Sequence, residues 1–222
     1  MVKTALAMIS AATVLGAVDA GFLPARYLAG GVPELPVRAV AGGEVFLELS
    51  VDESGSVTGV RPLRDTPGFT GLAVEAARGW FFKPAEDDVV QKLPNGRQRV
   101  VPIEAPAKVF FASIARAPVL TGFTLGEPPE DVASPSPEIA WPINRVIPPY
   151  PPLAARSGVV LLEAYVGAEG SVSRVRVLRS SPPFDEAARG ALKQWVFRPA
   201  RRQGVNVPAF VYVAFGFPMP VT

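Results

Sequence analysis

Apolar and polar residues alternate along two stretches of the chain, over residues 45–51 and 160–166. A period of two is typical of a half-buried β-strand, because successive side chains point to opposite faces. A glycine-containing turn follows each stretch, and a return strand is predicted over 57–64 and 172–179. We therefore expect two β-hairpins. In the second return strand arginines alternate with valines, which predicts one basic face and one packed face.

A short helix is predicted after each hairpin. Apolar residues recur at three- and four-residue spacing over 69–80 and 184–195, which places them on one side of a helix. A last strand is expected over 103–112 and 208–217. Two strands, a helix and a strand predict the α+β fold class, with the helix packed on one face of a small sheet.

The two sets of elements read as copies of one β-β-α-β module. A shift of 115 positions aligns residues 33–85 with 148–200 without a gap, and 23 of the 53 aligned residues are identical. Such self-similarity predicts two modules that fold alike. Their boundaries are placed at 33–113 and 148–222, and the first copy carries an insertion over 85–101.

Proline-rich sequence separates the two copies at residues 114–147. Proline at this density favours an extended, semi-rigid linker. The chain as a whole has 25 prolines and 20 glycines among 222 residues, which predicts short helices and many turns. We therefore expect two independent modules joined by a Pro-rich tether.

The first 20 residues have the composition of a secretory leader. One lysine precedes an apolar stretch over 5–18, and Val18-Asp19-Ala20 then precedes Gly21. The apolar stretch is shorter than the roughly 20 residues that a membrane-spanning helix needs. We predict a signal peptide over 1–20, cleaved before Gly21. The alternative is an uncleaved leader that anchors the protein in the membrane.

The chain contains no histidine and no cysteine. This composition excludes histidine bases, cysteine nucleophiles, disulfides and the ordinary zinc, haem and iron–sulfur sites. The sequence has no phosphate-binding glycine motif, and the acidic residues at 86–88 are interpreted as a solvated loop rather than a calcium site. We predict a protein without enzymatic activity, cofactor or metal.

Charge is unevenly distributed along the chain. The net charge is only +2, which predicts no nucleic-acid partner. Residues 114–222 hold 11 basic and 8 acidic groups, and most of the basic ones are at or beyond Arg174. Two interpretations stay open: these residues form a solvated basic face, or they dock an acidic partner.

Motifs in the second copy resemble the TonB C-terminal domain. They are the segment IPPYPPLAARSG at 147–158, the segment SSPPFD at 180–185, and a Trp-x-Phe-x-Pro-Ala ending at 195–200. The first copy resembles the domain more loosely. The resemblance implies a periplasmic module of energy-transducing proteins, which couple the inner-membrane proton gradient to outer-membrane receptors.

The resemblance also implies a binding mode. Domains of this family capture a short extended segment of a receptor by strand addition, and the unpaired edge of the last strand supplies backbone hydrogen bonds. Carried over to this chain, the partner-binding residues are Tyr150, Pro151, Pro208, Phe210, Tyr212, Ala214, Phe215 and Phe217. For Tyr150 a role in the core is the alternative.

The resemblance therefore implies a periplasmic protein that binds extended segments of outer-membrane TonB-dependent receptors and takes part in energy transduction and transmembrane transport. Membrane contact is expected only if the leader stays uncleaved and anchors the chain in the inner membrane. The alternative is a non-transducing envelope scaffold, or a dimerising module that self-associates by pairing its exposed strand edges.

The leader interpretation predicts the mass of the mature protein. Intact-mass measurement on separate soluble and membrane fractions should find a chain that begins near Gly21 in the soluble fraction. That result would exclude direct energy transduction. A full-length chain held in the membrane fraction would contradict the cleavage prediction and restore the transducer interpretation.

Overall fold

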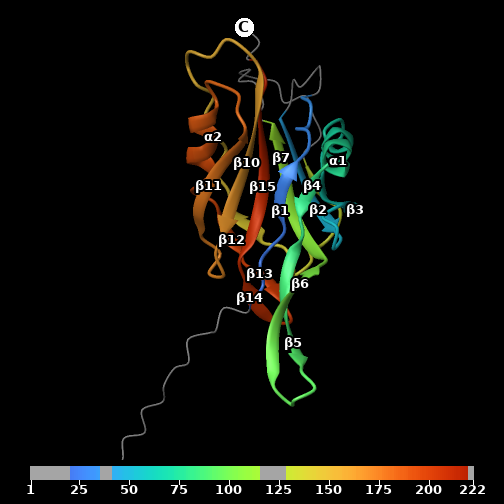
Figure 1. The fold of residues 1–222 in the computed structure, drawn as a ribbon. Helices are drawn as coiled ribbons and strands as arrows, with labels where there is room; N and C mark the ends of the chain where they lie inside the picture. Colours follow the sequence, from blue (N-terminus) through green and yellow to red (C-terminus); the bar gives the residue numbers. More distant parts are fainter. Residues whose placement is uncertain (1–20, 36–41, 116–128, 220–222) are drawn as a thin grey trace, which may run out of the picture.

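The computed structural model describes residues 21–35, 42–115 and 129–219 (Figure 1). At its centre lies one sheet of seven strands in the order β11-β10-β15-β7-β2-β3-β8. All neighbours in this sheet are antiparallel except β7 and β15, which run parallel. The strands are β2 (Gly43–Val51), β3 (Val57–Asp65), β7 (Ala107–Ala115), β8 (Glu130–Asp131), β10 (Gly158–Val166), β11 (Val172–Arg179) and β15 (Ala209–Phe217).

The same pairing occurs on both sides of the β7–β15 pair. β2 lies between β3 and β7, and β10 lies between β11 and β15. The register also corresponds: Leu47 lies opposite Phe111, and Leu162, 115 residues further along, lies opposite Val213. The expected half-buried strands are instead buried on both faces, because each face of the sheet is covered by other elements.

The expected independence of the two halves is wrong. β7 and β15 pair over residues 110–115 and 211–216, so both halves share one continuous sheet. The physical reason lies in the composition of these strands. β15 is apolar at nearly every position and buried along most of its length, and a strand of this kind is typical of the inside of a sheet.

Two helices cover opposite faces of the sheet. They are α1 (Thr70–Arg78) and α2 (Asp185–Leu192), and Figure 1 shows them on opposite sides of the molecule. Leu47 shares one buried cluster with Ala77 of α1, and Leu162 shares the other with Leu192 of α2. A parallel central pair produces this arrangement, because it relates the halves by rotation about an axis along the strands.

A two-stranded sheet also contributes to the packing on each side. β1 (Arg26–Ala29) pairs with β4 (Phe81–Lys83), and β9 (Trp141–Asn144) pairs with β12 (Val196–Arg198). In each half, a tryptophan side chain forms a hydrogen bond to the backbone that follows β1 or β9. The indole of Trp80 donates to the carbonyl oxygen of Gly31 at 2.8 Å, and that of Trp195 donates to Val146 at 3.0 Å.

The described part of the proline-rich segment is not an extended tether. Residues 129–147 contain β8 and β9, and Ile139 and Ala140 are 1% exposed. The ring of Trp141 packs edge-on against Phe46 with ring centres 5.4 Å apart. These apolar residues cover the face of β2 and β7 that α1 leaves open, so burial overrides the preference of proline for an extended spacer.

Two hairpins precede the last strands. β5 (Ala85–Lys92) and β6 (Gln98–Ala105) form a long hairpin that projects from the body in Figure 1. β13 (Ala200–Arg202) and β14 (Val205–Val207) form a short one. The insertion over 85–101 thus lengthens this hairpin. The last strand of the first half begins at Ala107 rather than Ile103, because Ile103 pairs with Asp87 inside the hairpin.

The predicted signal peptide over 1–20 lies outside the described residues. Within the part of the chain that the structure describes, neither helix has the length and apolar character needed to cross a membrane.

The geometry of the turn at Gly170 predicts that even an alanine at this position destabilises the fold. Gly170 has a φ of +89°, and an added Cβ would overlap the carbonyl oxygen of Phe197. We expect Gly170→Ala to lower the free energy of unfolding by about 2 kcal/mol or more. Gly190→Ala is the control, because a Cβ at that helical position meets nothing within 4 Å.

Urea unfolding of both variants measures the difference. The control should raise the free energy of unfolding by about 0.5–1 kcal/mol, since alanine favours the helix over glycine. Equal stability of the Gly170→Ala variant and the parent would contradict the described turn.

Candidate functional site

The last strand does not have the unpaired edge that the sequence predicts. β15 pairs with β10 on one side and with β7 on the other. Of the predicted binding residues on or beside β15, Pro208 and Phe210 are half-buried, whereas Tyr212, Ala214, Phe215 and Phe217 are buried. The prediction of an open edge is therefore wrong for this structure, because β7 already satisfies its backbone groups.

The aromatic residues of β15 divide between the two cores. Phe217 stacks on Phe184 with ring centres 4.5 Å apart, on the side of α2. Tyr212 faces the other core, where its hydroxyl accepts a hydrogen bond of 2.8 Å from the backbone N–H of Tyr27. Burial raises the pKa of Tyr212 above its ordinary value. Its hydroxyl therefore stays neutral and serves packing.

Tyr150 and Pro151 lie beside the end of β15 and are half-buried. The Tyr150 hydroxyl donates to the carbonyl oxygen of Arg156 at 2.8 Å. Its ring lies 5.5 Å from that of Phe184 and 6.4 Å from that of Phe217. Tyr150 thus fixes the loop before β10 against the core, and its ring is only partly available to a partner.

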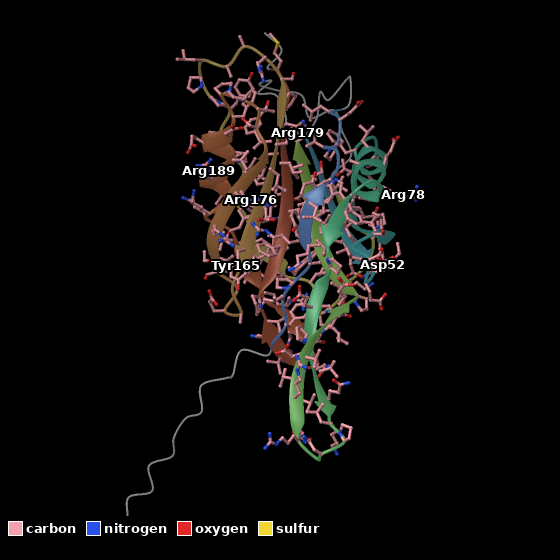
Figure 2. All side chains as sticks on the ribbon, viewed as in Figure 1. Asp52, Arg78, Tyr165, Arg176, Arg179 and Arg189 are labelled. Carbon is pink, nitrogen blue, oxygen red and sulfur yellow. The ribbon has the colours of Figure 1, made fainter. Side chains whose placement is uncertain are left out.

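The outer edge of β11 is open among the described residues, because β10 is the only strand there that pairs with it. Val175 and Val177 pack into the core under α2. Arg174, Arg176 and Arg179 are exposed, and Figure 2 labels the last two. The predicted division of β11 into a packed side and a basic side is therefore confirmed.

Each half of the sheet contains a buried carboxylate that pairs with an arginine. Glu163 is 2% exposed and accepts two hydrogen bonds of 3.1 Å from Arg176. Glu48 is 3% exposed and accepts one of 2.9 Å from Arg61. A buried ion pair needs a well-placed partner to offset desolvation. The sequence signal for these pairs was identity at both positions between the two copies.

The opposite edge of the sheet is partly covered by the chain itself. β8 pairs with the end of β3, with Asp131 opposite Arg64. Arg64 donates to both Asp131 carboxylate oxygens, at 2.6 and 3.1 Å, and to Glu44 at 2.6 Å. The hydrogen bond from Arg64 lowers the pKa of Asp131, so the pair persists until the pH falls through that lowered pKa.

Comparison with known proteins identifies part of this architecture. Residues 147–219 match the family model of the Gram-negative bacterial TonB protein C-terminal. The matched region contains β10, β11, α2 and β15, one complete half of the sheet. Over 80 residues the chain is 39% identical to Protein tonB2 of Pseudomonas aeruginosa, an alignment that covers 34% of this chain and 30% of that protein. The chain therefore spans less than a third of that relative.

Amide hydrogen exchange tests which edges are open. We expect the amides of residues 211–216 in β15 to exchange more than about a hundredfold more slowly than the outward-facing amides of β11, because both sides of β15 are paired. The measurement uses the whole chain, followed by NMR. Fast exchange along β15 would contradict its central place in the sheet.

Proposed function

We propose that the protein acts in the cell envelope in TonB-dependent transport, as a binding protein for outer-membrane receptors rather than an enzyme. The observation that carries this proposal is the match of residues 147–219 to the TonB C-terminal family. The 39% identity to Protein tonB2 of Pseudomonas aeruginosa over 80 residues supports it as well. The periplasm is the proposed compartment, reached by cleavage of the leader over 1–20.

The proposed binding mode is strand addition, in which an extended receptor segment joins the edge of a sheet. This mode needs backbone groups that no other strand has paired. β7 occupies the edge of β15 along six residues, so a receptor segment could join there only by displacing it. The outer edge of β11 is open among the described residues, so a segment could pair with its backbone without displacing another strand.

A second candidate function is a non-transducing envelope scaffold. The β7–β15 pair favours it, because the edge that the family uses for receptors is closed within the chain. In that case the two halves form a rigid body whose surfaces hold envelope proteins together. The duplicated modules would then have been retained for the sheet that they build jointly.

Deletion of the gene in its own bacterium separates the two candidates. Receptor binding predicts a severalfold loss of uptake for at least one substrate that enters by a TonB-dependent receptor, and full recovery on expression of the intact chain. Unchanged uptake across a panel of such substrates, together with sensitivity to detergents, would overturn the transport proposal and support the scaffold.

A further inference from the structure

At the β3 edge of the sheet, an acidic segment of the chain itself, β8, is already bound. β8 consists of Glu130 and Asp131 and lies antiparallel to the end of β3, with these residues opposite Asp65 and Arg64. The guanidinium of Arg64 binds both oxygens of the Asp131 carboxylate. An acidic extended segment is therefore held by backbone pairing and by a two-point ion pair.

The open edge of β11 carries an arginine at the corresponding place. In the first half Arg64 lies opposite Phe46 of β2, and in the second half Arg179 lies opposite Leu161 of β10. Both members of the second pair stand 115 residues after those of the first. Arg64 and Arg179 thus occupy the same position in their respective halves, each on the outermost long strand.

Arg179 differs from Arg64 in its ionic partners. Among the described residues no carboxylate forms an ion pair with Arg179 or with Arg174. Glu44, which also binds Arg64, corresponds to Val159. Under the same shift of 115 positions, Glu130 and Asp131 of β8 correspond to Leu15 and Gly16. Neither of these residues is acidic.

The rest of the β11 edge suits an anionic strand as well. Arg174 is exposed, and its guanidinium carbon lies 5.9 Å from the centre of the Tyr165 ring. Arg176 is committed to Glu163, yet its side chain is 47% exposed. Within the described part of the chain, β11 therefore presents unpaired backbone groups between Arg174 and Arg179, neither of which has an ionic partner there. Both features attract an extended acidic segment.

We infer that the outer edge of β11 is a docking site for an acidic extended segment, which adds antiparallel to β11 with a carboxylate opposite Arg179. The inference rests on the proposed function for the source of the segment, which is an outer-membrane receptor. It assigns Arg174 and Arg179 to docking rather than to a solvated face. It also moves the binding edge from β15 to β11.

The chain's own acidic segment provides a probe. A synthetic peptide of residues 129–136, PEDVASPS, is titrated into the full chain and followed by backbone NMR. Chemical-shift changes should concentrate on residues 172–179. A control peptide with both acids replaced by their amides, PQNVASPS, should bind at least about threefold more weakly, because it lacks the ionic partner of Arg179.

Two variants with the same change in charge test the role of Arg179. Arg179→Gln should weaken the acidic peptide about three- to tenfold. Arg97→Gln, at an exposed site on the distal turn of the long hairpin, should change its affinity by less than about twofold. Equal effects of the two variants, or shifts confined to β15 or to β3, would overturn the inference.

Photo-crosslinking in cells tests the β11 site and the receptor role independently of each other. A photoreactive residue at Ser173, exposed on β11, should capture an outer-membrane receptor, whereas one at the corresponding Thr58 on β3 should not. Peptide binding at β11 combined with capture of a protein other than a receptor would support the acidic-segment site and contradict the proposed function. Capture of a receptor from Thr58 alone would overturn the site.

Discussion

The parallel pairing of β7 with β15 determines the arrangement of everything else in the molecule. It joins two four-element units into one sheet and buries the apolar last strand of each. Because the pair is parallel, the helices lie on opposite faces and each helix leaves half of a face uncovered. The segments before β2 and before β10 contribute to closing those gaps, through Tyr27 on one side and Trp141 on the other.

Local periodicity predicted the hairpins and the helices because these elements depend on neighbours in sequence. The stripes ending at Trp80 and Trp195 form α1 and α2 with only small differences in their ends. The join between the halves depends on residues about 100 positions apart, and an alternating pattern does not distinguish an edge strand from a central one. The nearly unbroken apolar sequence of β15 was the available signal.

The basic side of β11 was predicted from the sequence, and the closed edge of β15 was not. The basic side of β11 followed from arginines that alternate with valines, and the structure has it. Of the residues taken from the family resemblance, those from Tyr212 to Phe217 fall in the core, and the others are half-buried. The resemblance implies a binding strand for an isolated domain, whereas in this chain β7 pairs along that strand.

The presence of both halves in one chain has a consequence for stoichiometry. Two identical modules joined by their last strands as separate chains would present two equal outer edges, and such an assembly would be bivalent. Within one chain the two edges differ: β8 pairs with the end of β3, while the described residues leave β11 without an equivalent cover. Under the proposed docking at β11, one molecule would therefore engage one acidic segment at that edge and would not link two partners through equivalent edges.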